Sequence, residues 1–278
     1  MSEKIIVSMT SYQHRLKNIP IVLDTIFSQT LHPDLVVLNL AYDEEIPDEV
    51  QIYIDKHCIE VNRVKDTKVY KKLIPTLKKY PNDCIITIDD DFLYPRGMID
   101  DFMSVHQQYP DYPISGNREI YNVFQCHCGC ASLTKADFLG DFIDKIDSDV
   151  ITNCPCDDIV YTYFSNKNGH PYIRTHELYF YNMQSFQEGD RYSDMVGDRA
   201  LTTSYNYLVG RYGNVGDNLH IYVHDKVIKD IIEDMIKTRT SNAYSAGCKI
   251  ICSSYSYRIG HFLLEPMRKI LRYKADEK

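Results

Sequence analysis

The sequence lacks the long apolar runs that membrane helices need. A membrane-spanning helix requires roughly 18 to 20 consecutive apolar residues, and no stretch of the chain approaches that length. The first residues, Met1-Ser2-Glu3-Lys4, are not a cationic region followed by a long apolar run, so they do not resemble a signal peptide. We therefore expect a cytoplasmic protein.

A surplus of basic residues is also missing. The formal net charge of the 278-residue chain is −8, whereas binding to nucleic acid depends on clustered lysine and arginine side chains. The sequence has no internal repeat, no low-complexity tract and no Pro- or Ser-rich linker. These absences exclude nucleic acid as the expected partner and predict one large domain, with at most an appendage.

Cysteine, in contrast, is abundant. The chain has nine cysteines, and an odd number without an export signal favours reduced thiols over a disulfide framework. Two short runs, Cys126-His127-Cys128-Gly129-Cys130 and Cys154-Pro155-Cys156, raise the question of zinc. Structural zinc sites usually pair cysteines two to four residues apart, and C-x-C places neighbours on opposite sides of a strand. Small residues that line a pocket are the favoured interpretation.

Short apolar runs alternate with amphipathic stretches, a pattern typical of βαβ units around a mostly parallel sheet. A helix is expected near Asn18, which can cap it, with Pro20 in its first turn. Residues 190–216 show no clear period and predict a long loop or lid. The other expected strands and helices are strands at 4–9, 35–40, 59–64 and 84–88, and helices at 46–57, 70–80, 98–109, 135–146, 157–164, 217–237 and 262–274.

The strongest chemical signal is the acidic triplet Asp89-Asp90-Asp91. It follows the apolar strand CIITI, so it lies at the carboxyl end of a strand, where open α/β sheets place ligands. Mg²⁺ or Mn²⁺ prefers carboxylate oxygens and completes its coordination with water and substrate phosphates. In an extended chain Asp89 and Asp91 share one side, which makes Asp91 the first metal ligand, with Asp89 either sharing the metal or bonding the ribose of a bound nucleotide. The alternative is a solvated turn after a strand.

At this point the chain resembles the GT-A glycosyltransferases, in particular the family 2-like bacterial enzymes that build capsular and lipopolysaccharide glycans. The likeness covers about residues 4 to 170, and its pieces occur in the family's order. They are VSMTSY at 7–12 with Arg15, KKLIPTL at 71–77, IDDD at 88–91 with Tyr94-Pro95, and CDDI at 156–159. The resemblance implies an α/β GT-A domain at 1–216, with a nucleotide-sugar half at about 1–95 and an acceptor half at about 96–216. Residues 217–278 would form a helical region packed on that domain.

The resemblance also implies a nucleotide-sugar donor, most often a UDP-sugar, and a glycan or lipid-linked glycan acceptor. The side chains implied to border the donor are Thr10, Ser11, Tyr12, Arg15, Asp66, Lys72, Asp89 and Asp90. Asp66 departs from the pattern because Thr67-Lys68 follows it in place of a Gly-rich step. For Arg15 and Lys72 the alternative is an ordinary surface cation.

The pair Asp157-Asp158 is implied to be catalytic, with Asp158 as the base that removes a proton from the acceptor hydroxyl. Asp157 would orient the acceptor or cap a helix, whose positive end also favours acidic residues. We expect inversion of configuration, because the sequence has no His-x-x-Gly-x-x-Lys segment late in the chain. His220 or His224 could add a late metal ligand, although an isolated histidine is more often structural.

Two other functions compete with this one. A sugar-nucleotide nucleotidyltransferase needs a Gly-rich phosphate loop near the N-terminus, which residues 9–17 do not provide. The other rival is a binding module organised by zinc on the cysteine runs. The basic amphipathic segment at 262–274 could contact an anionic membrane surface as a peripheral anchor, but packing on the core is favoured because amphipathic helices are normal in globular folds.

Overall fold

The computed structural model describes residues 3–116, 131–174, 184–185, 199–215 and 220–222. All of them belong to one compact unit, Met1–Val223. The run Cys126–Cys130, most of the expected loop at 190–216, His224 and the basic segment at 262–274 lie outside the described residues. The side chain of His220 is likewise outside them.

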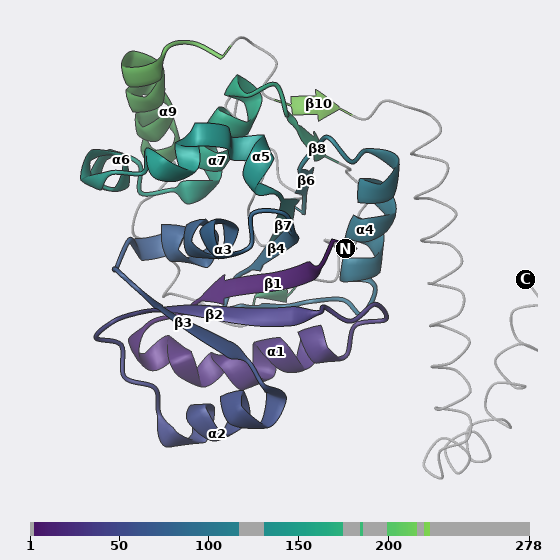
Figure 1. The fold of residues 1–278 in the computed structure, drawn as a ribbon. Helices are drawn as coiled ribbons and strands as arrows, with labels where there is room; N and C mark the ends of the chain where they lie inside the picture. The colour runs from purple at the N-terminus through teal and green to yellow at the C-terminus, as the bar shows by residue number, and fades with distance from the viewer. Residues whose placement is uncertain (1–2, 117–130, 175–183, 186–198, 216–219, 223–278) are drawn as a thin grey trace, which may run out of the picture. The chain divides into compact units, whose positions relative to one another are not determined.

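Most of the described strands form one eight-stranded sheet with the order β10-β8-β6-β7-β4-β1-β2-β3 (Figure 1). Only β7 runs antiparallel to its neighbours there, so the expected mostly parallel sheet is confirmed. The short strands β5 and β9 pair separately. The strands are β1 (Ile5–Thr10), β2 (Leu35–Ala41), β3 (Glu60–Val64), β4 (Cys84–Ile88), β5 (Phe92–Leu93), β6 (Ile114–Ser115), β7 (Ala131–Thr134), β8 (Tyr172–Arg174), β9 (Gln184–Ser185) and β10 (His220–Tyr222).

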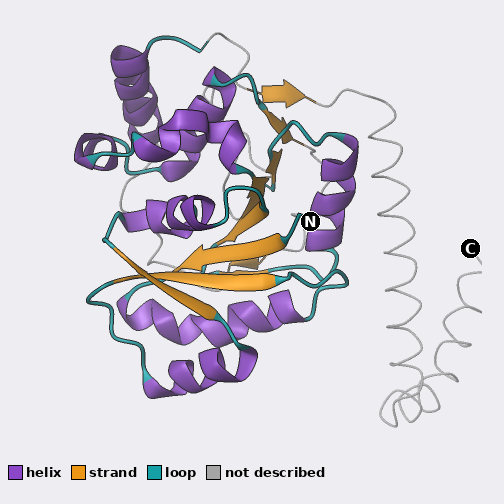
Figure 2. Cartoon of the chain, viewed as in Figure 1, coloured by secondary structure: helices purple, strands orange, loops and turns teal. Residues whose placement is uncertain are grey.

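Helices cover the sheet on both sides, with α1 and α2 on one side of β1 to β3 and α3 on the other (Figure 2). The hydrophobic core joins the central strands to α3, α5, α7 and α9 through residues such as Ile85, Leu77 and Val160. The helices are α1 (Ile19–Phe27), α2 (Asp48–His57), α3 (Ile74–Lys79), α4 (Met98–Gln108), α5 (Ala136–Leu139), α6 (Ser148–Asn153), α7 (Asp157–Lys167) and α9 (Arg199–Tyr212), with 3₁₀ helices at Gln13–Asn18, Lys68–Lys72 and Gly140–Asp144.

Strand β4 has the bounds that the sequence predicts, because all five of its residues are buried and a central parallel strand is apolar on both faces. Helix α1 also begins where expected, with a proline in its first turn. Asn18, however, makes no side-chain capping bond, since it ends a 3₁₀ helix and already has helical backbone angles. The expected helix at 135–146 is interrupted at Gly140, whose φ of +55° is a left-handed value that an α-helix does not contain.

Two further predictions are wrong within the described residues. Helix α9 occupies 199–212, where a long loop was expected; it is held by tertiary contacts, with Leu208 fully buried in the core shared with α7. Strand β10 at 220–222 replaces the first part of an expected helix, because it pairs in parallel with β8. The rest of that helix is outside the described residues.

Candidate active site

The parallel register brings the carboxyl ends of β1, β2, β3 and β4 to one edge of the sheet. β1 pairs with β2 up to Thr10, β2 pairs with β3 up to Val64, and β1 pairs with β4 on its other side. The segments that follow Thr10 and Ile88 therefore leave the sheet at the same edge. This edge is where an open α/β sheet binds its ligands.

The acidic triplet does not continue the strand. β4 ends at Ile88, and Asp90 and Asp91 lie in a turn, so the alternation of sides expected for an extended chain does not apply. Asp90 and Asp91 are each 6% exposed, whereas the side chain of Asp89 is 30% exposed. The alternative interpretation was right about the turn but wrong about its exposure, because the triplet is a largely buried cluster.

Arg15 neutralises the buried part of the triplet. Its Nη2 atom forms ion pairs with Asp90 and, at 3.0 Å, with Oδ2 of Asp91, while Ser11 Oγ donates a hydrogen bond of 2.6 Å to Asp90. Burial opposes the charge of Arg15, but the two carboxylates raise its pKa above the ordinary value. Burial raises the pKa of Asp90 to about 6, although Arg15 and Ser11 act in the opposite direction.

Lys72 connects the triplet to the second acidic pair. Its Nζ atom lies 3.1 Å from Asp89 Oδ1, 3.3 Å from Asp157 Oδ2 and 3.8 Å from Asp158 Oδ1. The lysine side chain is 8% exposed. Burial opposes its charge, yet the surrounding carboxylates raise the pKa of Lys72 well above its ordinary value, so the ammonium stays protonated.

The two acids of α7 differ in exposure. Both lie in the first turn of the helix, as expected, and the N-cap residue Cys156 makes no side-chain capping bond. The side chain of Asp157 is 6% exposed and that of Asp158 is 20% exposed. Burial raises the pKa of Asp157 above its ordinary value, and the neighbouring carboxylates add to this effect against the pull of Lys72. Asp158 is therefore the more accessible of the two to a substrate.

Tyr94 fixes the backbone where the triplet begins. The N–H of Asp89 donates a 2.7 Å hydrogen bond to the Tyr94 hydroxyl, which lies 3.3 Å from the Asp89 carbonyl oxygen. Tyr94 is only 4% exposed. The sequence indicated Tyr94 only as part of a motif and assigned it no contact, because a tyrosine three residues after the triplet has many possible partners.

A buried polar network under the site was also missed. Ser8 Oγ lies 2.6 Å from Thr76 Oγ1 and donates to the carbonyl of Lys72 at 2.6 Å, and Asn39 Nδ2 donates to Ser8 and Thr76 at 3.0 and 2.9 Å. These bonds attach the lysine-bearing segment to β1 and β2. The available signal was a polar residue inside each apolar strand, Ser8 in IIVSMT and Asn39 in LVVLNLA.

The remaining predicted donor residues are less closely involved. The Tyr12 ring lies under the Arg15 guanidinium at 5.6 Å, and Thr10 donates a 2.7 Å hydrogen bond to the carbonyl of Asn39. Asp66 follows β3 at the same sheet edge, but its contacts in the described part of the chain are with Lys68 and the neighbouring Lys71. The structure thus joins Arg15 and Lys72 to the triplet and leaves Asp66 outside that cluster.

The charges of this cluster favour a divalent cation. Five carboxylates, from the triplet and the start of α7, face the two cations Arg15 and Lys72, which leaves an excess of three negative charges. Carboxylate oxygens are the ligands that Mg²⁺ and Mn²⁺ prefer. The chemistry of this donor set therefore suits such an ion.

The cysteines of the described part are all free thiols: Cys58, Cys84, Cys154 and Cys156. Cys154 is buried in the core, where its carbonyl accepts a 2.6 Å hydrogen bond from the Tyr70 hydroxyl. No helix among the described residues is long and apolar enough to cross a membrane.

Comparisons with known proteins identify the type of fold. No protein-family model matches the chain, and no curated protein matches it in sequence. A mannosyltransferase from Pyrobaculum calidifontis in complex with GDP-Man and Mn²⁺ is similar over 93% of this chain and 83% of its own, with a TM-score of 0.60 and 13% identity. At that identity the likeness shows the fold alone, and the expected GT-A-like architecture is confirmed.

Two further structures are more distant. S. aureus TarS 1–349 in complex with UDP is similar over 59% of this chain and 54% of its own, with a TM-score of 0.43 and 12% identity. A 4-diphosphocytidyl-2C-methyl-D-erythritol synthase is similar over 72% of this chain and 100% of its own, with a TM-score of 0.45 and 12% identity.

Proposed function

We propose that the chain is a metal-dependent glycosyltransferase that moves a sugar from a nucleotide-sugar donor to a hydroxyl of a glycan or lipid-linked glycan, with inversion. One observation carries the proposal: a single buried ammonium, Lys72, contacts both the acidic triplet and the acidic pair of α7. The triplet and the pair are 66 or more residues apart in sequence. The resemblance implies complementary roles for them, donor binding for the triplet and proton removal for the pair.

The donor side of the proposal rests on the triplet. Asp89 and Asp91 would hold Mn²⁺ or Mg²⁺, which when bound neutralises negative charge on the departing nucleoside diphosphate. Arg15, fixed by its ion pairs with Asp90 and Asp91, keeps the turn in place. Because Tyr94 fixes the backbone of Asp89 by hydrogen bonds, the ligand oxygens start from a defined position.

The acceptor side rests on Asp158. A base must reach the acceptor hydroxyl, and Asp158 is more exposed than Asp157, which is enclosed beside Lys72. Asp158 would take the proton as the hydroxyl attacks the anomeric carbon. Asp157 and Lys72 would hold the start of α7 against the triplet, so that base and donor keep a fixed separation. The resemblance further suggests an acceptor in a bacterial surface glycan.

The first experiment is a thermal-shift screen of UDP- and GDP-sugars with and without Mn²⁺, followed by a transfer assay with the best donor. A ligand at 100 times its dissociation constant stabilises a protein by about 2.7 kcal/mol. We expect Asp158→Asn to keep the donor-induced shift and to lose about 10²- to 10⁴-fold in kcat, the usual contribution of a general base. Asp141→Asn, whose side chain is 94% exposed, is the matched control and should behave as wild type.

The double variant Asp89→Ala/Asp91→Ala tests the donor side separately. We expect a folded protein that no longer responds to Mn²⁺ with a nucleotide sugar. If this variant binds and uses donors as well as wild type does, the proposal is wrong. The released product separates the rival enzyme class, because a glycosyltransferase releases a nucleoside diphosphate and a nucleotidyltransferase releases pyrophosphate. Assignment of the anomeric configuration of the product by NMR tests inversion.

A further inference from the structure

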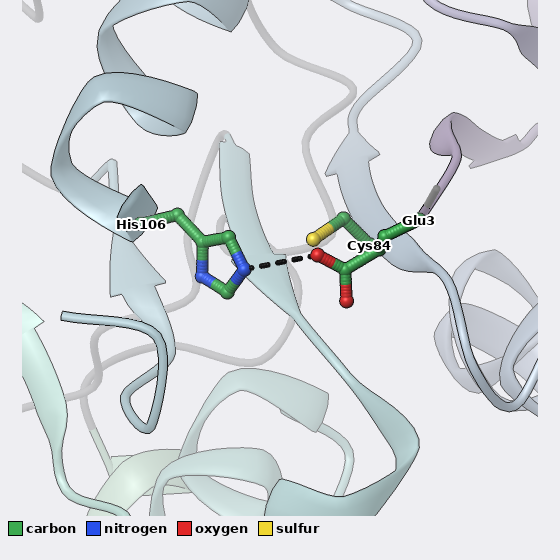
Figure 3. Close-up of side chains that lie close together, drawn as sticks. All are labelled: Glu3, Cys84 and His106. Atoms are coloured by element: carbon green, nitrogen blue, oxygen red, sulfur yellow. Dashed lines mark hydrogen bonds and ion pairs between the residues drawn. The ribbon is translucent and has the colours of Figure 1, made fainter. Parts of the chain in front are cut away.

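A second group of metal-ligating side chains lies at the opposite edge of the sheet. Glu3 precedes β1, Cys84 is the first residue of β4, and His106 is on α4. One potential ligand atom from each of the three lies within 4.8 Å of the others, the only such group among the described residues. In Figure 3 the His106 imidazole and the Glu3 carboxylate face one another, with the Cys84 sulfur beside the carboxylate.

The group is anchored by backbone and side-chain bonds. The N–H of Cys84 donates to the carbonyl of Lys4 at 2.9 Å, and the N–H of Lys4 donates to Asp83 at 3.0 Å, so the segment that carries Glu3 is attached to the start of β4. Glu3 Oε1 pairs with Lys135, and Glu3 Oε2 lies 3.2 Å from His106 Nε2. One carboxylate oxygen is thus held from outside while the other faces the histidine, the arrangement in which an outer partner orients a metal ligand.

One buried polar atom of the group has no hydrogen-bond partner within the described part of the chain. His106 is only 4% exposed, and its Nδ1 atom has no hydrogen-bond partner among the described residues. Cys84 is fully buried. Burial raises the pKa of the Cys84 thiol, and the Glu3 carboxylate adds to the effect.

We propose that Glu3, Cys84 and His106 form a zinc site, distinct from the acidic cluster. Thiolate, imidazole and carboxylate together suit Zn²⁺, whereas Mg²⁺ and Mn²⁺ prefer oxygen alone. Ligand atoms on a tetrahedral zinc lie roughly 3.3 to 3.8 Å apart, close to the 3.2 Å between Nε2 of His106 and Oε2 of Glu3. Three protein ligands leave one coordination position for water. Zinc there would tie the N-terminal segment to β4 and α4.

The two sites are separated by the length of β4. Cys84 begins this strand and the acidic triplet follows its end. At about 3.3 Å per residue, the distance along the strand is about 16 Å. The proposed zinc therefore takes no part in sugar transfer. The zinc proposal and the glycosyltransferase proposal are independent, so either can fail without the other.

The test uses the full chain purified without a histidine tag, loaded with Zn²⁺ or with Co²⁺ alone. We expect one equivalent of tightly held Zn²⁺ and, with Co²⁺, a thiolate-to-cobalt charge-transfer band in the near ultraviolet. Cys84→Ala should abolish the band. Glu3→Ala, at a partly exposed side chain that is not needed for the core, should weaken binding at least 10-fold with an unchanged circular dichroism spectrum.

Two controls separate this site from the other cysteines. Cys58→Ser changes an exposed thiol, and the triple variant Cys126→Ser/Cys128→Ser/Cys130→Ser removes the cysteine run at 126–130; both should keep the band. The proposal is overturned if the chain binds no zinc in stoichiometric amount, if the band survives Cys84→Ala, or if it disappears in the triple variant. If Cys84→Ala fails to fold, the zinc affinity of the folded Glu3→Ala variant tests the proposal in its place.

Discussion

Lys72→Met removes the positive charge that joins the acidic triplet to α7 while keeping most of the side-chain volume. Breaking a buried ion pair by removing one partner costs about 3 to 5 kcal/mol, because it leaves an uncompensated buried charge. Of the three carboxylates around Lys72, Asp157 is buried, whereas Asp89 and Asp158 are 30% and 20% exposed. Water can screen the last two, so we expect a loss near the lower figure, about 3 kcal/mol.

For a protein of this size 1 kcal/mol corresponds to about 2 to 4 °C, so the melting temperature should fall by about 6 to 12 °C. Urea unfolding followed by circular dichroism gives the free energy directly. Lys78→Met on α3 is the matched control, since this lysine is 50% exposed and pairs with the 83% exposed Asp144 at 2.9 Å. Its loss should stay within about 0.5 kcal/mol. A Lys72→Met protein as stable as the control would show that the ammonium does not hold the carboxylates together.

Three smaller perturbations test other contacts. Tyr94→Phe leaves the N–H of Asp89 without its acceptor and should cost about 1 to 3 kcal/mol in urea unfolding, with weaker Mn²⁺-dependent donor binding; an unchanged unfolding curve would remove Tyr94 from the site. Asp147→Ala removes the N-cap of α6 and should cost about 1 kcal/mol at pH 7. Hydrogen bonds from α9 and the α6 backbone lower the pKa of Asp147 to about 2, so its contribution is full above about pH 4 and is lost as the pH falls through 2. Mass-spectrometric mapping at pH 8 should find Cys58 alkylated well before Cys154, because burial raises the pKa of Cys154 to about 12; equal rates would contradict this.

Only the half of the main sheet formed by β1 to β4 was predictable, and within it β1, β2 and β4 are largely buried on both faces. Such strands are continuous apolar runs, and CIITI at 84–88 has the same bounds in sequence and structure. The order of strands and the antiparallel β7 were not predictable, since pairing partners are set by contacts distant in sequence. Helix α9 was missed for the same reason: its stability comes from burial of residues such as Leu208 against α7, and its own composition gives little helical signal.

The residues of the site were predictable by type but their pairing was not. From the sequence alone, Arg15 and Lys72 could each have been an ordinary cation on the protein surface. Only the strand register that brings β1 beside β4 places Arg15 against Asp90. The triplet was expected to alternate as an extended chain does, but the strand stops at Ile88 and a turn follows. A turn after the strand was left open as the alternative, but its burial against Arg15 depends on a contact that is distant in sequence.

The gathering of acids at this edge explains why Arg15 and Lys72 are buried there. Carboxylates brought together without counter-charges repel one another, and burial strengthens that repulsion because water no longer screens it. Two resident cations make the cluster compatible with folding, yet three negative charges of the five remain unbalanced. A site balanced fully by its own cations would have no charge left to attract a divalent ion. A site without them would leave every carboxylate buried against its neighbours when no metal is bound. If the proposed function is correct, the intermediate balance would let the chain fold without a metal and still favour an ion that binds together with a diphosphate.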